Sequence, residues 1–309
     1  PSRGLGDVYK RQAIQRAHWR QDDPGTFDTG DVYGSGGPTG VTFYENGALD
    51  DKWIGTYLSC EASRNPVFGY QPKPKGATYT MDRFNFLSTR NLSSNISEEE
   101  RDERVHFRPS DISIGPDGAI YVADWYDPGS GGHATRDESS SGAIYRIAPK
   151  GFKTVIPTLN LQSINGQIEA LLSPEPNIRF LGFQALQKNG NKAYTAVIEL
   201  LNHKNPYLAA RAIWLLPYLG DAGIKKVQSL LKSKDAQYRL VAYRSLRRSG
   251  QNLIPHAKVL AKDKNAGVRR DVALSMRAYS AKQSNSVLLE VCKRYDGVDK
   301  NYVESIGLG

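Results

Sequence analysis

One loop of this 309-residue chain gathers the side chains that could do chemistry. Residues 125–142 contain His133, Arg136 and Asp137 among glycines and serines. A histidine titrates near neutral pH and can act as a general base. An arginine can hold a carboxylate through two parallel hydrogen bonds, and an aspartate can orient either neighbour. The same three residues could instead form a hydrogen-bonded loop that ties down the edge of a sheet, and the residue types alone leave both interpretations open.

A second group, Asp124, Trp125, Tyr126 and Asp127, opens this loop. The two aromatic rings could wall a site for a flat cofactor or a sugar, or they could pack between neighbouring sheets. For Trp125 we favour packing. The two aspartates could contribute to a Ca²⁺ site, although that ion takes roughly six to eight oxygen ligands.

The hydrophobic pattern places the loop between short strands. Residues 111–114 and 143–147 alternate polar and apolar side chains, 119–123 form a short apolar run, and an Asp117-Gly118 turn favours a tight hairpin between the first two. Three antiparallel strands with one long polar loop are typical of a β-propeller blade. A second blade is predicted over residues 40–79. Its strands are expected at 41–44, 55–60 and 66–70, with a further strand within 77–87. Pro72 and Pro74 are expected to mark the exit of the chain from this blade.

From residue 152 the period changes to 30 residues. The repeats begin at Ser173, His203, Ser233 and Asp263. Each carries three apolar positions four residues apart, which form one helical face. These columns are Ile178, Leu208, Tyr238 and Val268; Gly182, Ala212, Ala242 and Val272; and Leu186, Leu216, Leu246 and Met276.

Gly190, Gly220 and Gly250 stand where a left-handed C-cap belongs, and a second apolar stripe follows each glycine. Two helices per repeat predict an α-solenoid of four repeats. Val298, Tyr302 and Ile306 continue the three columns, so we expect a truncated fifth repeat at the end of the chain.

Charge divides the chain. Residues 1–151 carry 17 basic and 21 acidic side chains, whereas residues 152–309 carry 24 and 11, so the net charges are −4 and +13. Arg179, Arg239 and Arg269 recur at one repeat position, which indicates structural roles in the turns between helices. The basic surface therefore favours a solvated face or a dock for an acidic protein over a nucleic-acid site.

The sequence gives little support for a membrane-spanning helix or for a cysteine-based haem or redox site. No apolar run approaches the ~20 residues of a membrane-spanning helix. Cys60 and Cys292 lie in no CxxC or CxxCH setting, so the sequence holds no haem-attachment motif, and both are expected to be small buried hydrophobes.

The stretch RPSDISIGPDGAIYVADWYDPG, with the His133, Arg136 and Asp137 loop after it, resembles the last blade of the membrane-bound-dehydrogenase-like family. That family is a branch of the soluble quinoprotein (glucose/sorbosone dehydrogenase-like) propellers of exported bacterial proteins. Residues 37–70 resemble its preceding blade, and the repeats resemble compact HEAT repeats of the phycobilin-lyase type.

The resemblance implies part of an exported, periplasmic dehydrogenase that oxidises a sugar or alcohol with pyrroloquinoline quinone and Ca²⁺. His133 would be the base and Asp137 its orienting partner, with Arg136, Trp125 and Tyr126 at the cofactor and Asp124 and Asp127 as metal candidates. Electrons would pass to a c-type cytochrome domain downstream or in trans. The alternative is a non-catalytic propeller that binds a glycan or a protein, with the solenoid as its scaffold.

The expected organisation has three parts. Residues 1–12 resemble an adapter-derived leader and are excluded from the fold. Residues 13–151 are expected to be the C-terminal part of a β-propeller, and 152–309 the HEAT-like solenoid. On this interpretation the chain is the middle of a longer protein.

Overall fold

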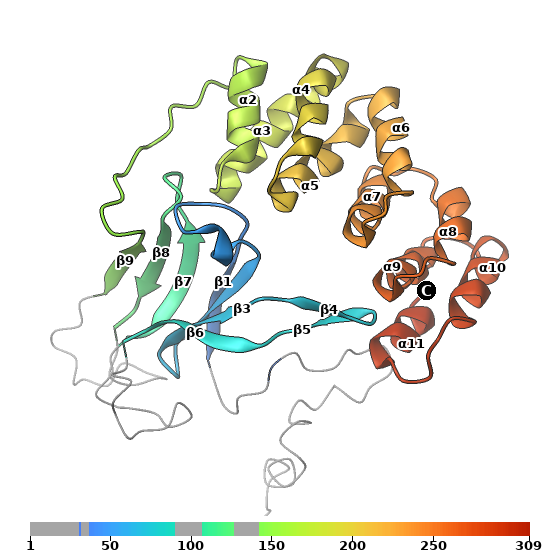
Figure 1. Ribbon diagram of the computed structural model, residues 1–309, viewed down its shortest axis with the longest axis horizontal. Coiled ribbons are helices and arrows are strands. Elements are labelled where there is room, and N and C mark those ends of the chain that lie inside the picture. Colours follow the sequence, from blue (N-terminus) through green and yellow to red (C-terminus); the bar gives the residue numbers. More distant parts are fainter. Residues whose placement is uncertain (1–30, 32–36, 90–106, 127–141) are drawn as a thin grey trace, which may run out of the picture.

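The computed structural model describes residue 31 and residues 37–89, 107–126 and 142–309. Within these ranges, β-sheets come first along the chain and helices follow (Figure 1). The solenoid curves as an arc away from the sheets (Figure 1). No described helix is both long and apolar enough to cross a membrane.

The first sheet has four antiparallel strands in the order β1-β2-β3-β6. They are β1 (Pro38–Tyr44), β2 (Thr56–Glu61), β3 (Pro66–Tyr70) and β6 (Arg83–Ser88). The second sheet is β7 (Pro109–Ile114), β8 (Ile120–Asp124) and β9 (Ala143–Ile147), also antiparallel. The predicted strands are confirmed to within one to three residues at their ends.

The two sheets lie side by side through their first strands, β1 and β7. Gly40 permits this approach, because a Cβ there would come within 2.5 Å of the Asp111 Cα. One apolar core spans both sheets: Tyr44, Leu58, Cys60, Val67, Phe107, Ile112, Ile114, Ile120 and Val122. Within the described ranges the sheets do not close into a complete propeller.

The prediction that the chain leaves the first sheet at Pro72 and Pro74 is wrong. The chain instead forms a hairpin of β4 (Lys73–Lys75) and β5 (Thr78–Thr80) before it returns as β6. Gly76, at φ +56°, makes the turn, and Pro74 is tolerated because this two-stranded ribbon leaves its edge unpaired. The hairpin reaches across to the far end of the solenoid (Figure 1).

The helical region alternates outer helices with inner helices. The elements are α2 (Ile164–Leu172), α3 (Pro176–Asn189), η3 (Gly190–Ala193), α4 (Tyr194–Glu199), η4 (Leu200–Asn202), α5 (Pro206–Leu215), η5 (Leu216–Tyr218), α6 (Asp221–Leu230), α7 (Ala236–Arg248), α8 (Ile254–Leu260), α9 (Ala266–Met276), α10 (Ala281–Cys292) and α11 (Lys300–Gly307). Four inner helices begin 30 residues apart. Their N-cap residues are Glu175, Asn205, Asp235 and Asn265, and each accepts a backbone hydrogen bond from its first turn.

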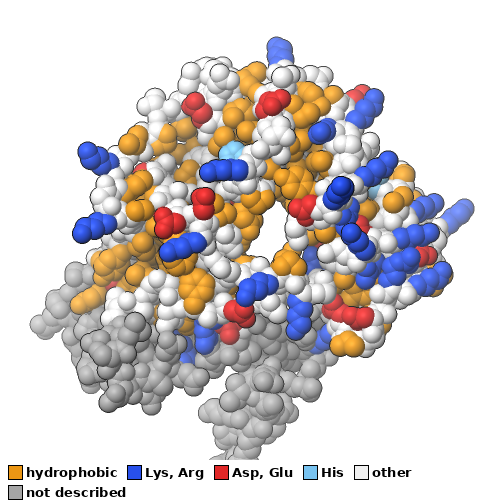
Figure 2. Space-filling model, viewed as in Figure 1, with side chains coloured by type: hydrophobic (Ala, Val, Ile, Leu, Met, Phe, Trp, Pro, Cys, Tyr) orange, Lys and Arg blue, Asp and Glu red, His pale blue; other side chains and the backbone are white. Residues whose placement is uncertain are grey.

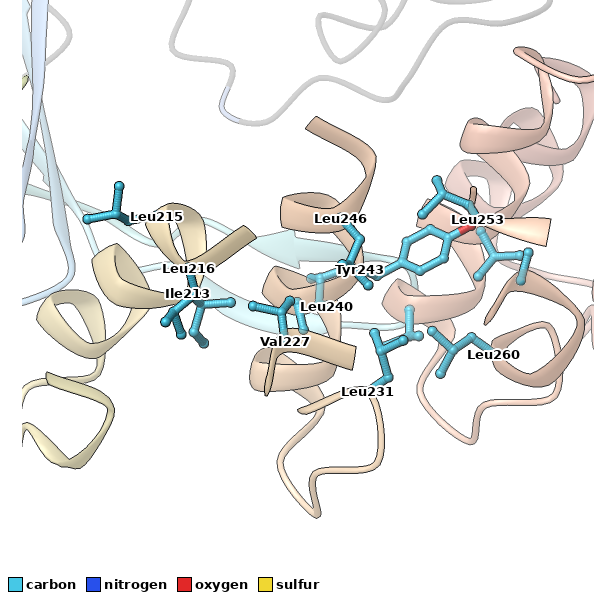
Figure 3. Close-up of a cluster of buried hydrophobic side chains, with 14 of the residues drawn as sticks. Ile213, Leu215, Leu216, Val227, Leu231, Leu240, Tyr243, Leu246, Leu253 and Leu260 are labelled. Atoms are coloured by element: carbon cyan, nitrogen blue, oxygen red, sulfur yellow. The ribbon is translucent and has the colours of Figure 1, made fainter. Parts of the chain in front are cut away.

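The predicted apolar columns face the core. The column of Leu186, Leu216, Leu246 and Met276 is fully buried. Figure 3 shows such side chains meeting between successive helices, with Leu240 and Tyr243 of α7 beside Val227 of α6 and Leu260 of α8. Burial of this continuous stripe stabilises the stack, since no single repeat could cover its own apolar face.

Two details of the repeat differ from the prediction. Gly190 (φ 53°, ψ −132°) and Gly220 (φ 98°, ψ −174°) have positive φ, but their ψ values are not those of a left-handed C-cap. Val298 is 83% exposed and precedes α11, whose N-cap Asp299 follows Asn265 by 34 residues instead of 30. The longer turn therefore shifts the columns by four residues. Val298 lies outside the helix, and the buried Tyr302, three residues after the N-cap, takes the first-column place that Val268 holds in α9.

Candidate functional site

Asp124 shapes the turn from which the candidate loop departs. It is buried at the end of β8, and its Oδ1 accepts hydrogen bonds from the backbone N–H groups of Arg108 (2.7 Å) and Tyr126 (2.8 Å). The Trp125 N–H donates to the Arg108 carbonyl at 3.0 Å. Tyr126 follows with φ 55°, in the left-handed region. The Asp124 carboxylate thus holds the backbone of this turn in place, and it fixes the direction in which the chain leaves β8.

The aromatic residues of this turn keep large exposed surfaces. Trp125 is 42% and Tyr126 37% exposed. Each residue still buries more than half of its surface, and the packing of Trp125 between sheets stays a prediction. Next to them, burial and the neighbouring Asp124 carboxylate raise the pKa of Tyr145 above its ordinary value.

His133, Arg136, Asp137 and Asp127 lie outside the described residues. Their assignment as base, cofactor ligand, orienting residue and metal ligand therefore stays a prediction. Among the residues that the structure does describe, no cluster of three or more histidine, cysteine or acidic side chains could hold a metal ion.

A buried polar group joins the end of β2 to the segment before β7. Asn65 Nδ2 donates to the Phe107 carbonyl at 2.5 Å, and Arg108 Nη1 donates to the Ala62 carbonyl at 3.3 Å. Glu61 Oε1 accepts the N–H of Ser63 at 3.0 Å and closes the same turn. The sequence analysis did not identify these residues. Their available signal was a polar run directly after an apolar strand, with Asn65 at φ 76°, which asparagine tolerates better than most residues.

A second polar centre joins the sheets to the solenoid. Glu45 Oε2, just after β1, accepts from Arg179 Nη1 at 2.6 Å and from Arg211 Nη2 at 2.7 Å and Nε at 3.0 Å. Arg211 also donates to the Leu171 and Ser173 carbonyls. Burial lowers the pKa of Arg211 to about 10, against the opposing effect of Glu45. Glu45 has no recognisable sequence signal, because its partners come 134 and 166 residues later.

A pocket of about 270 Å³ opens beside this junction. Phe180, Phe183 and Trp214 supply its apolar wall. Arg248 lies over the Trp214 ring, with its guanidinium carbon 5.8 Å from the ring centre. Arg248 makes no ion pair with a described residue. The pocket thus combines an aromatic wall with an available cation, and this combination suits an acidic ligand with a flat apolar face.

The cysteines differ from each other. Cys60 is buried between the sheets, and burial raises its pKa to about 12, so it is the inert hydrophobe expected. Cys292 is exposed at the end of α10, so the prediction of burial is wrong there. It is the last residue of the outer helix α10, on the side of that helix that faces away from the core.

Two family models match separate parts of the chain. Residues 194–277 match the family model of HEAT repeats, so the helical region contains HEAT repeats. Residues 8–151, the β-rich region, match a family model described as a domain of unknown function (DUF7133). No curated protein matches the chain.

Proposed function

We propose that the two sheets are neighbouring blades of a β-propeller and that the loop after β8 forms part of the active site of an exported, quinoprotein-type dehydrogenase. The observation that carries the architecture is the contact between β1 and β7. In a propeller the first strand of each blade lies nearest the axis, so adjacent first strands approach each other as these do.

The turn at Asp124 supports the placement of the site. It is held by hydrogen bonds to both flanking segments, and it presents two half-exposed rings, Trp125 and Tyr126, at the base of the loop. These rings fit one face of a flat cofactor such as pyrroloquinoline quinone. Arg136 would bind the carboxylates of that cofactor, which would accept the two electrons of the alcohol. His133, oriented by Asp137, would take the hydroxyl proton of a sugar or alcohol, and a c-type cytochrome domain would receive the electrons.

A Ca²⁺ ion in this site would need ligands besides Asp124 and Asp127. One Asp124 oxygen is already engaged by two backbone N–H groups. Asp124 and Asp127 would therefore supply only part of the oxygen ligands of a Ca²⁺ ion at the start of the loop.

The test is cofactor-dependent dye reduction by this chain. With added pyrroloquinoline quinone and Ca²⁺, a panel of sugars and alcohols should reduce an artificial electron acceptor. His133→Ala should lower kcat by about a hundredfold or more, a typical loss for a general base. His256→Ala, in α8, should leave it unchanged. A well-folded chain that neither binds the quinone nor reduces the dye with any substrate would refute the proposal.

The alternative is a non-catalytic binding protein. For a glycan site at the junction of the sheets and the solenoid, the observation that favours it is the junction pocket, whose lining comes mainly from the solenoid. A ligand with a carboxylate and a flat sugar face would contact Arg248 and Trp214 there. Titration with uronic-acid oligosaccharides should then quench tryptophan fluorescence. Arg248→Gln should weaken binding while the neighbouring Arg247→Gln should not. Equal effects of the two variants would remove this alternative.

A further inference from the structure

Three lysines occupy the same place in three consecutive repeats of the solenoid. Lys204, Lys234 and Lys264 stand 30 residues apart, each in the turn between an outer and an inner helix. All three are exposed, and none forms an ion pair with a described residue. We call these three residues the lysine ladder. Equivalent turns of a solenoid lie along one edge, so the ladder follows that edge.

The backbone of each ladder turn is held by a repeated hydrogen bond. The residue before each lysine accepts, through its side chain, the N–H of the residue after it: His203 Nδ1 from Asn205 at 3.0 Å, Ser233 Oγ from Asp235 at 3.2 Å, and Asp263 Oδ1 from Asn265 at 2.8 Å. Each lysine is therefore enclosed in a small closed turn. Its Cα has little freedom to move, although its side chain is solvated.

Two arginines, the buried Arg239 and the half-buried Arg269, brace the second and third turns further. Arg239 Nη1 donates to the Ser233 and Lys234 carbonyls at 2.8 and 3.1 Å, and Arg269 Nη1 donates to the equivalent carbonyls of Asp263 and Lys264 at 2.7 and 3.2 Å. These contacts confirm the structural role predicted for the recurring arginines. They also separate the two kinds of basic residue: the arginines hold the turn, and the lysines are left available on its outside.

The ladder lies in a basic surface. Lys232 and Lys262 precede two of its members by two residues and are exposed as well. Among the acidic residues of these turns, Asp263 is buried against Arg239, with both guanidinium contacts at 2.7 Å, so only Asp235 offers an exposed negative charge. Figure 2 shows Lys and Arg side chains gathered over the right-hand end of the solenoid, where α8–α11 lie.

We propose that the lysine ladder binds an extended acidic segment of a partner polypeptide. Helices packed in successive layers are about 8–10 Å apart, which sets the pitch of the ladder. A peptide in the extended polyproline II conformation advances about 3.1 Å per residue with about three residues per turn. An acidic side chain at every third residue therefore lies on one face of such a peptide and matches that pitch.

A nucleic acid fits less well. Duplex DNA carries one charge per about 1.7 Å, far denser than a single row of lysines about 8–10 Å apart. The inference is independent of the proposed dehydrogenase activity, because it concerns only the edge of the solenoid.

The test is fluorescence anisotropy at low salt with a labelled peptide of Glu-Gly-Ser repeats. A peptide of the same composition with its glutamates in one block is the first control. The triple variant Lys204/Lys234/Lys264→Gln should bind the spaced peptide roughly tenfold more weakly, since each exposed charge contributes a few tenths of a kcal/mol up to ~1 kcal/mol. The matched variant Lys192/Lys225/Lys282→Gln has the same net charge, changes exposed lysines of the outer-helix layer, and should bind within about twofold of the unmodified chain.

Thermal melts of both variants should match the unmodified chain, because all six lysines are exposed. Equal losses in the two variants would show a general charge effect and overturn the proposal. Equal binding of the peptide with spaced glutamates and the peptide with its glutamates in one block would show that the spacing of the ladder does not select the ligand, and would overturn the proposal. Tighter binding of duplex DNA than of the peptide would replace the acidic polypeptide with a nucleic acid.

Discussion

Glu45 is the residue on which the attachment of the solenoid most depends. Its carboxylate is the anionic partner of both Arg179 and Arg211, and the Arg211 side chain is only 7% exposed. Removing the charge leaves a buried guanidinium with no counterion, and such losses cost about 3–5 kcal/mol when a pair is fully buried. Glu45 itself is about a quarter exposed, which reduces the effect.

We therefore expect Glu45→Gln to lower the free energy of unfolding by roughly 2 kcal/mol, measured by urea denaturation. Asp82→Asn removes the exposed ion pair with Lys73 and should change it by less than about 0.5 kcal/mol. Indistinguishable unfolding curves for the two variants would contradict the assignment of Glu45 as the central residue of the junction.

Asp117 makes the second sheet sensitive to acid. Burial alone would raise its pKa, but hydrogen bonds from Arg146 and from the Ala119 N–H outweigh burial and hold the pKa below its ordinary value. A carboxyl with a depressed folded-state pKa stabilises the fold above its unfolded pKa of about 4, and this stabilisation is lost as pH falls through the folded value.

The stability difference between the unmodified chain and Asp117→Asn should therefore be full at about pH 5 and shrink steadily toward about pH 3. Urea unfolding at a series of pH values measures it. A difference that stays constant over this range would show that the carboxylate charge is not what stabilises the hairpin.

At the scale of elements, the solenoid depends on a close approach of α2 and α3 at Gly182. A Cβ at this position would lie 2.4 Å from the Leu171 nitrogen and 2.7 Å from the Gln167 carbonyl oxygen, both backbone atoms that cannot move alone. Gly307, in α11, has open space in the same direction.

Gly182→Ala should thus destabilise the chain by about 1–3 kcal/mol through overpacking, although alanine is the better helix former. Gly307→Ala should be neutral or stabilising by up to about 1 kcal/mol. Thermal unfolding of both variants checks the opposite signs. A stabilised Gly182→Ala chain would mean that the two helices lie further apart than described.

What the sequence predicted at this scale follows from periodicity. Helices and strands were found because burial repeats every 3.6 or two residues, and the 30-residue period placed the buried columns of the solenoid correctly. The β4–β5 hairpin escaped prediction because Pro74 normally marks the end of a strand, and its partner surface belongs to helices about 200 residues later. The Glu45 junction was missed for the same reason, since tertiary contacts over such separations leave no local pattern.

At the scale of the whole molecule, the chain closes on itself. The solenoid leaves the sheets at the Glu45 junction, and the tip of the β4–β5 hairpin meets it again at α9 and α11. Ala77, at this tip, is buried in the core of the solenoid, its N–H donates to Asp299 Oδ2 at 2.7 Å, and its carbonyl accepts from Arg270. Figure 2 shows an opening between the hairpin and the arc of helices. Closure fixes the described sheets relative to the solenoid.

Hydrogen exchange at the Ala77 amide tests this closed arrangement most directly, because the only described acceptor of that N–H lies 222 residues away. We predict slow exchange in the unmodified chain and acceleration of about tenfold or more in Asp299→Ala, corresponding to ~1.4 kcal/mol of lost protection. Asp221→Ala, which removes an exposed carboxylate in α6, should leave the Ala77 rate unchanged. Rapid exchange of Ala77 in the unmodified chain would contradict the account, because the hairpin would then be free. The described contacts between the sheets and the solenoid would be confined to the junction around Glu45, Asn46 and Tyr207.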